Sequence, residues 1–260
     1  SSIQVTPLAS GSQGNSVLVE AGGRSLLVDA GLPVDALEER LAIVGKRPGQ
    51  IDALLLTHRH RDHIRGAADF VRRYKTRVLS TRRTLRSLPN DLHRRYHAVV
   101  PGTPRMVGSV RVAAFALSHD APDTVGFRIT CENDSYGHAT DLGRFDESVV
   151  SALHRCRVVY LEFNHDRQLL DQGTYPPLLK RRIASDWGHL ANDSAAALLQ
   201  QLCWPGLEHV FLAHLSQHNN RPELALDAAR KAMIAAKAAP RLTIARQEAP
   251  TQVPVALPEL

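Results

Sequence analysis

The sequence is short of cysteine, and its three cysteines (Cys131, Cys156 and Cys203) lie far apart with no Cys-x-x-Cys pair. An odd number of scattered cysteines argues against a disulfide framework and is typical of the reducing cytoplasm. No apolar run approaches the roughly 18 residues needed to cross a bilayer. Residues 1–20 also lack a basic start followed by an apolar core. We therefore expect a cytoplasmic protein with neither a membrane span nor a signal peptide.

Internal repeats, low-complexity tracts and long linkers are also missing from the sequence. A hydrophobic content of 43% and a charged content of 22% are ordinary for a globular protein. A chain of 260 residues can bury a sizeable core. We expect one domain that spans residues 1–260.

The densest feature that is present is the run Thr57-His58-Arg59-His60-Arg61-Asp62-His63, which directly follows the apolar stretch 53–56. Histidine nitrogens and carboxylate oxygens are the ligands that suit zinc, manganese and iron(II). A solvated polar loop rich in histidine is the alternative interpretation. Such a density of ligands after a buried strand favours a metal site.

Short apolar runs bounded by Gly, Pro or polar clusters predict the strands, and apolar periodicity predicts the helices. We expect Asn192 and Asn220 to be N-caps, and Pro222 to lie in a first helical turn. The tail 247–260 is expected to be extended. The expected strands are 3–8, 16–21, 25–29, 53–57, 77–80, 110–117, 124–131, 135–141, 158–163 and 209–213. The expected helices are 35–44, 64–74, 146–153, 193–203 and 222–239. This order suggests sheets that are covered by helices.

The other metal-capable residues also lie at strand ends. His119 follows the strand 110–117, Asp141 ends the strand 135–141, and His214 follows the strand 209–213. Open α/β sheets bind ligands outside the carboxyl ends of their strands. Seven candidate ligands suit two metal ions about 3.5–4 Å apart. We expect Asp141 to bridge the two ions, because a shared carboxylate reduces their repulsion, and a bridging hydroxide to act as the nucleophile.

The order His58-x-His60-x-Asp62-His63, then His119, Asp141 and His214, resembles the metallo-β-lactamase superfamily. Further motifs resemble its YycJ/WalJ-like subgroup: Ser10-Gly-Ser-Gln-Gly-Asn15-Ser16, Asp29-Ala-Gly31, Ser118-His-Asp-Ala121, Ala139-Thr-Asp-Leu-Gly143, Leu161-Glu-Phe-Asn-His-Asp166, Tyr175-Pro-Pro-Leu-Leu-Lys-Arg-Arg-Ile183, Gly188-His-Leu-Ala-Asn192 and His214-Leu-Ser-Gln-His-Asn-Asn220.

The resemblance implies an α/β fold, a four-layer αββα sandwich of two mixed sheets flanked by helices. It also implies a metal-dependent phosphodiesterase with 5′-to-3′ exonuclease activity on DNA. By position, His58, His60 and His119 would hold one divalent ion, and Asp62, His63 and His214 the other. Zinc and manganese are the expected metals, and iron is a further candidate.

Several residues near the ligands are candidates for catalysis, ligand support or substrate binding. His189 is expected to act with Asp62 in catalysis, by protonating the leaving alkoxide or binding a phosphate oxygen; an ordinary surface histidine is the alternative. Asp29 and His165 are expected to orient ligands, although each could simply belong to a turn. The remaining candidates are Ser12, Asn15, Lys180, Arg181 and Asn219. His93, His97, His138, His154, His209 and His218 have no site that the sequence assigns.

The segment Arg72–Arg95 contains nine Lys or Arg residues against one acid, Asp91. Such a basic patch is expected of a protein that binds phosphates, although a solvated helix surface is equally compatible. The sequence has no helix-turn-helix or zinc-finger pattern, so we expect a nucleic acid, DNA by resemblance, to be bound through its backbone. The alternative is a small-molecule hydrolase of thioesters, lactones or cyclic phosphodiesters. Flavin-linked di-iron chemistry is disfavoured, because such relatives usually carry Glu at the position of His60.

Overall fold

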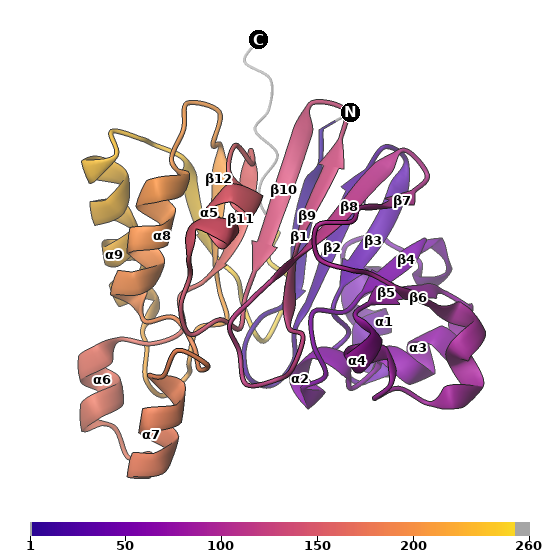
Figure 1. Ribbon diagram of the computed structural model, residues 1–260, viewed down its shortest axis with the longest axis horizontal. Coiled ribbons are helices and arrows are strands. Elements are labelled where there is room, and N and C mark those ends of the chain that lie inside the picture. Colours follow the sequence, from indigo (N-terminus) through magenta and orange to yellow (C-terminus); the bar gives the residue numbers. More distant parts are fainter. Residues whose placement is uncertain (1, 253–260) are drawn as a thin grey trace.

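The computed structural model describes residues 2–252 and consists of two β-sheets packed face to face, with helices on both outer faces (Figure 1). The first sheet has the order β1 (Gln4–Ala9), β2 (Ser16–Ala21), β3 (Arg24–Val28), β4 (Ala53–Leu55), β5 (Arg77–Ser80), β6 (Tyr96–Ala98). The second has the order β13 (Arg241–Ile244), β12 (His209–Ala213), β11 (Val158–Glu162), β10 (Asp134–Ala139), β9 (Val125–Cys131), β8 (Val110–Ala116), β7 (Arg105–Val107). Both sheets mix parallel and antiparallel neighbours.

The helices form the two outer layers. The helices between β3 and β6 are α1 (Val34–Ile43), α2 (Arg61–Ile64), α3 (Ala67–Tyr74) and α4 (Arg82–Leu85). Those after β10 are α5 (Glu147–Leu153), α6 (Arg167–Gln172), α7 (Pro177–Ile183), α8 (Asn192–Leu202) and α9 (Pro222–Ala235). Buried residues of α1 and α3 pack on the first sheet, and those of α5, α8 and α9 pack on the second.

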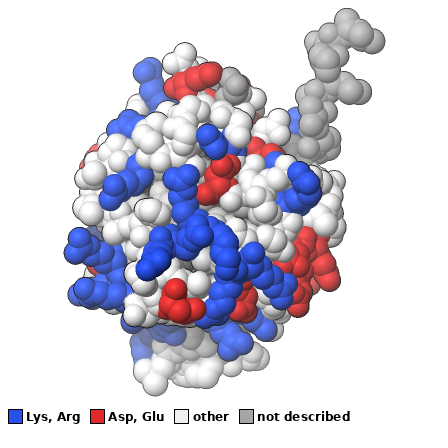
Figure 2. Space-filling model, turned by 90° about the vertical axis from the view of Figure 1, so that its right-hand side faces the viewer, with Lys and Arg blue, Asp and Glu red and all other residues white. Residues whose placement is uncertain are grey.

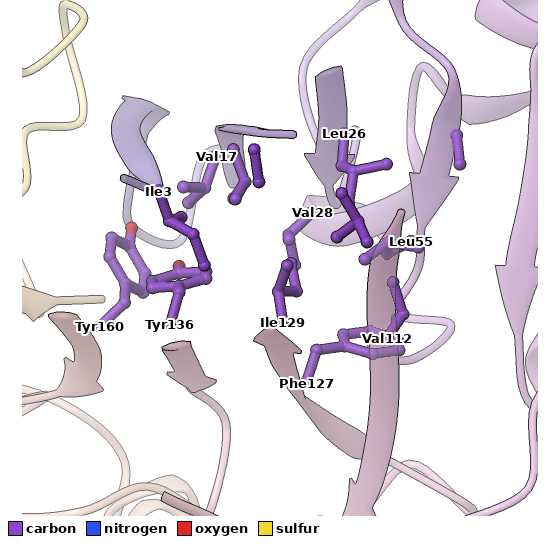
Figure 3. Close-up of a cluster of buried hydrophobic side chains, with 14 of the residues drawn as sticks. Ile3, Val17, Leu26, Val28, Leu55, Val112, Phe127, Ile129, Tyr136 and Tyr160 are labelled. Atoms are coloured by element: carbon purple, nitrogen blue, oxygen red, sulfur yellow. The ribbon is translucent and has the colours of Figure 1, made fainter. Parts of the chain in front are cut away.

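The strands are apolar on both faces because both faces are covered. Leu26 and Val28 of β3 face the second sheet, whereas Leu27 between them faces the helices. Figure 3 shows the layer between the sheets, where side chains such as Val28 and Phe127 approach from opposite sides. This alternation follows from the two-residue period of a strand. The expected αββα sandwich of two mixed sheets is confirmed.

Parallel pairing brings the carboxyl ends of the central strands to one edge of the sandwich. Strands β3, β4, β5 and β6 are parallel to one another in the first sheet, and β10, β11, β12 and β13 in the second. The segments that follow these strands lie at the lower end of both sheets in Figure 1, near α2. Loops from both sheets therefore meet there.

Some expected elements differ from the structure. The helix expected over 64–74 is split at Gly66, because the Gly66 amide donates to the Ala30 carbonyl oxygen at 2.8 Å instead of to a helical partner. The short strands β6, β7 and β13 were not expected; all three are sheet edges and include exposed or half-exposed residues, which weakens the apolar pattern. The short helices α4, α6 and α7 were also missed.

Both expected asparagine N-caps are wrong. Asn192 is the first residue of α8 after the N-cap Ala191, and the N-cap of α9 is Arg221 rather than Asn220. The two asparagine amides instead bond to each other, at 2.8 and 3.0 Å, in a buried contact. Pro222 does lie in the first turn of α9, as expected.

The expected extended tail lies mostly outside the described residues. Within residues 2–252, residues 247–249 form bends, and no helix is long and apolar enough to cross a membrane.

Candidate metal centre

Seven histidine and aspartate side chains meet at the shared edge of the two sheets. His58 and His60 follow β4, and Asp62 and His63 lie on the single turn α2. The other three follow strands of the second sheet: His119 after β8, Asp141 after β10 and His214 after β12. The structure therefore brings together all seven residues that the sequence singled out as ligands.

The backbone is strained at two of these ligands and at Asp29, a residue that also directly follows a strand. Asp29, Asp141 and His214 have φ angles of 64°, 62° and 55°. Non-glycine residues in this left-handed region cost about 1–3 kcal/mol each and persist where the surrounding structure holds them. Each turns the chain sharply at the end of a strand, so that its side chain stays at the sheet edge.

His58, His60 and His119 form the first group of candidate ligands. One ring nitrogen from each lies within 4.8 Å of the other two. His119 Nε2 is 3.3 Å from His60 Nδ1. Donors about 2.1 Å from one zinc ion at tetrahedral angles lie about 3.4 Å apart. The spacing of this pair fits two ligands of one ion.

Asp62, His63 and His214 form the second group. Asp62 Oδ2 is 3.5 Å from His63 Nε2 and 3.6 Å from His214 Nε2. Asp141 lies between the groups, with Oδ2 3.0 Å from His63 Nε2 and Oδ1 3.7 Å from His119 Nε2. One carboxylate therefore contacts both groups, as a bridging ligand would.

The second nitrogen of each imidazole has its own polar partner. Such partners fix the ring and direct the other nitrogen toward a metal. The contacts are His58 Nδ1 to Thr57 Oγ1 at 2.9 Å, His60 Nε2 to Asp120 Oδ1 at 3.4 Å, His63 Nδ1 to Asp29 Oδ2 at 2.7 Å, His119 Nδ1 to the Gly188 carbonyl at 3.0 Å and His214 Nδ1 to Glu162 Oε1 at 2.9 Å. Asp29 also accepts hydrogen bonds from the Thr57 amide and hydroxyl, both at 2.8 Å.

Three buried polar atoms of the centre have no hydrogen-bond partner among residues 2–252: His58 Nε2, Asp141 Oδ2 and His214 Nε2. Buried polar atoms without partners are unusual in folded proteins. One belongs to each group of ligands and one to the carboxylate between them. Divalent cations would satisfy all three atoms, so the residues present fit metal ions.

The electrostatics of the centre also favour cations. Burial opposes charge on His214, yet the neighbouring carboxylates of Asp141, Asp62 and Glu162 raise its pKa to about 10. Burial likewise opposes charge on His63, but Asp141, Asp29 and Asp62 hold its pKa well above the usual value. Protons and metal ions therefore compete for the same nitrogens, and metal binding at neutral pH releases protons.

Glu162 is a central residue that the sequence analysis missed. It ends β11, is fully buried, and its Oε1 lies 2.9 Å from both His189 Nδ1 and His214 Nδ1. Backbone amides of Asp141, Leu142 and Leu190 also donate to this carboxylate. These five donors occupy the lone pairs of the Glu162 carboxylate, so Glu162 positions the two imidazoles rather than binding an ion itself. The signal in the sequence that could have identified Glu162 was its position as a charged residue directly after the apolar run 158–161.

His189 faces the centre from the loop before α8. Its side chain is 21% exposed and lines the cleft beside Asp141 and His214. Burial opposes its charge, but Glu162 raises its pKa. With Nδ1 held by Glu162, Nε2 is the nitrogen left for a substrate. Asp62, 26% exposed, also lines this cleft.

The small-residue loop before β2 lies against the same centre. Ser12 lines the cleft, and Asn15 Nδ2 lies 3.3 Å from the Asp62 carbonyl oxygen and 3.4 Å from Asp62 Oδ2. Gly31 touches the Asp62 carbonyl so closely that no side chain fits there. These contacts fix the backbone of α2. Asn15 and Asp29 therefore contact candidate ligands, whereas Ser12 faces the cleft.

Three expected substrate or support residues lie elsewhere. Lys180 donates to the Asp171 carbonyl oxygen. Neither Lys180 nor Arg181 lines the cleft or the neighbouring recess. The side of α7 that faces them is formed by Leu179, Arg182 and Ile183, which are three and four residues apart. Arg182 is the basic residue that faces the centre. Asn219 is buried, and its Nδ2 has no hydrogen-bond partner within the part of the chain that the structure describes.

His165 does not contact a candidate ligand directly. Its Nδ1 is 3.2 Å from Asn164 Oδ1, and Asn164 in turn donates to the His214 carbonyl oxygen. Burial lowers the pKa of His165 to about 4, so the ring is neutral at physiological pH. His165 belongs to the turn that supports His214.

A cleft of ≈ 280 Å³ opens over the centre. Besides the ligands, its walls include His218, which the sequence had left without a site, and Tyr175, whose ring centroid is 5.7 Å from that of His218. The arrangement combines cation ligands, a histidine held by a buried carboxylate, and an arginine. Such a site can bind a phosphoryl group and hydrolyse it.

Comparison with known proteins gives a consistent picture. Residues 24–215 match the family described as "Beta-lactamase superfamily domain". The chain is 33% identical over 224 residues to the exodeoxyribonuclease WalJ of Streptococcus pneumoniae, covering 84% of this chain and 83% of that protein. It is 32% identical over 225 residues to the exodeoxyribonuclease YycJ of Bacillus anthracis, covering 84% of each.

Among solved structures, the metallo-beta-lactamase fold protein YhfI of Bacillus subtilis superimposes with a TM-score of 0.75. The match has 18% identity and covers 97% of this chain and 100% of that one. At this identity the likeness concerns the fold alone.

Proposed function

Because this chain belongs to the beta-lactamase superfamily and is a metal-dependent hydrolase of that fold, we propose that it is an exonuclease that degrades DNA in the 5′-to-3′ direction. The observation that carries the proposal is the cluster of seven histidine and aspartate side chains, in a chain whose sequence is similar over 84% of its length to two proteins named exodeoxyribonucleases. The proposal treats the chain as a single hydrolase domain. It also places the protein in the cytoplasm, since its three cysteines are free.

We assign His58, His60 and His119 to one divalent ion and Asp62, His63 and His214 to a second, with Asp141 shared between them. Nitrogen and oxygen donors of this kind suit zinc or manganese, and iron is a third candidate. Bound ions of this type supply hydroxide at neutral pH and neutralise the phosphoryl oxygens. Asp62 faces the cleft and orients the attacking water.

His189 supplies the proton that the leaving oxygen requires. Glu162 holds Nδ1 at 2.9 Å, which leaves Nε2–H to donate toward the cleft when the ring is protonated. The same Glu162 oxygen lies 2.9 Å from His214 Nδ1. One carboxylate thus positions the proton donor relative to a metal ligand.

A basic surface beside the centre supports a nucleic acid as substrate. All nine Lys and Arg residues of Arg72–Arg95 are exposed, and blue side chains gather on this face in Figure 2. Nearby acids neutralise part of the expected charge: Arg72, Arg73 and Arg83 form ion pairs. Arg82 and Arg86 have no acidic partner among residues 2–252, and they border a hollow of ≈ 440 Å³ with Tyr96.

Neutralising Arg82 and Arg86 together, as R82Q and R86Q, is expected to weaken DNA binding and to flatten its salt dependence. Two lost phosphate contacts lower the slope of log K against log salt by roughly 1.4–1.8. Hydrolysis of bis-nitrophenyl phosphate should be unchanged, because this small substrate does not extend from the metal centre to Arg82 and Arg86. Binding titrations at several salt concentrations measure the effect.

The matched control removes the same charge from α9 and from the residues just after it, as R230Q and K237Q. These two positions are far in sequence from the basic segment Arg72–Arg95. That variant should keep the wild-type salt slope. If both double variants change binding equally, the effect is one of net charge and Arg82 and Arg86 are ordinary surface residues.

The proposed function is tested with purified protein, metals added back, on end-labelled DNA and RNA, single- and double-stranded. We expect stepwise release of mononucleotides from 5′-labelled DNA. Cleavage of RNA in preference to DNA, or hydrolysis of small phosphodiesters alone, would contradict the proposal.

A further inference from the structure

A second recess opens from the cleft, between α7 and the candidate metal centre. Its volume is ≈ 220 Å³, and it shares walls with the cleft at His119, Tyr175, Arg182, Ile183 and His189. The cleft over the ligands is only slightly larger, at ≈ 280 Å³. Because these walls are shared, the recess is an extension of the same site rather than a separate one.

One face of the α7 region forms the apolar wall of this recess. Leu179 and Ile183 are four residues apart on α7 and lie on one side of that helix, and Tyr175, which precedes the helix, lines the same recess. All three are half-buried. Leu178, next to Leu179 in sequence, lies outside the recess and is 75% exposed.

The mouth of the recess carries a paired arginine. Arg182 Nε lies 2.6 Å from Asp120 Oδ2, and its Nη2 also contacts that oxygen. The other Asp120 oxygen is 3.4 Å from His60 Nε2. Asp120 thus links Arg182 to a candidate ligand and holds the guanidinium, which is always charged, beside the centre.

The position of His189 decides which part of a substrate enters the recess. Hydrolysis breaks the bond from phosphorus to the leaving oxygen, forms one from phosphorus to the water oxygen, and delivers a proton to the leaving oxygen. In the proposed function His189 gives that proton, so the leaving group must sit next to it. His189 lines both the cleft and the recess, so a leaving group next to it extends from the cleft into the recess.

We propose that the recess binds the terminal nucleoside of the DNA strand, with its base stacked on Tyr175 and its own phosphate beside Arg182. The inference rests on the proposed exonuclease function, in which the leaving oxygen belongs to the terminal nucleoside. Stacking on an aromatic ring tolerates any base, because every base has a π-face.

The test compares Tyr175→Ala with Tyr175→Phe on two oligonucleotides, one with a normal 5′-terminal nucleotide and one with an abasic terminal residue. Loss of a stacked base typically costs about 5- to 100-fold. Tyr175→Ala should lower kcat/KM by that factor on the normal strand and by much less on the abasic one. Tyr175→Phe should retain wild-type values on both, and so should the matched control Leu178→Ala.

A readout independent of turnover uses the metal-free protein and a strand that ends in 5-iodouracil. Irradiation should attach the terminal base to Tyr175, as mass spectrometry of the peptides locates. A crosslink that maps elsewhere, no crosslink at all, or equal losses for Tyr175→Ala on both strands would overturn the inference. If the wild type fails to degrade DNA in the presence of metals, the proposed function itself fails, whichever residue is crosslinked.

Discussion

Replacing Asp141 with alanine is expected to lower the rate of DNA hydrolysis by at least about 100-fold. Residues that only support metal ligands are already worth about 10–100-fold. Asp141 is placed closer, because its two oxygens lie 3.0 Å from His63 Nε2 and 3.7 Å from His119 Nε2. The measurements are kcat on an end-labelled strand and metal content per chain.

The fold should survive this change, because Asp141 lies after β10 and outside the hydrophobic clusters. Circular dichroism checks that point. Asp186→Ala is the matched control, since this carboxylate is 73% exposed on a neighbouring loop. An Asp141→Ala protein that folds, holds its full metal content and degrades DNA at the wild-type rate would contradict the bridging assignment.

His189→Ala is expected to slow DNA cleavage by roughly 10²–10⁴-fold, the usual contribution of a positioned proton donor. A DNA strand expels an alkoxide of high pKa, which needs that proton. A nitrophenolate leaves without one, so hydrolysis of bis-nitrophenyl phosphate should change far less. Rates on both substrates, together with metal content, measure the effect.

Other outcomes assign His189 a different role. Equal losses on both substrates with the metals retained would mean that His189 binds the phosphate rather than protonating the leaving oxygen. Loss of metal would make it a ligand or a ligand support. His154→Ala, an exposed histidine at the end of α5, should leave both rates unchanged.

The sequence predicted where the candidate ligands lie because their signal is local. His58 to His63 follow a buried strand within six residues, and His119, Asp141 and His214 each stand at the end of an apolar run. Parallel strands in both sheets then bring those ends to one edge. The αββα sandwich followed from the resemblance of these motifs to the metallo-β-lactamase superfamily, and the order of the expected strands and helices predicted only sheets covered by helices.

The residues that the sequence missed depend on contacts between distant segments. Glu162 reads as the polar end of a strand until His189 and His214 are seen on its carboxylate. Arg182 was passed over for Lys180 and Arg181, because only the rotation of α7 decides which of three adjacent cations faces the cleft. Edge strands such as β13 lack the apolar pattern of central strands, since one side has no neighbour.

The central claim is a centre of two ions held by the seven side chains. It is tested most directly by removing metal with a chelator, adding back zinc or manganese, and counting the ions bound per chain by elemental analysis. The account predicts about two ions per chain, with DNA hydrolysis lost on chelation and restored as the ions bind. One ion or fewer in fully active protein would contradict it.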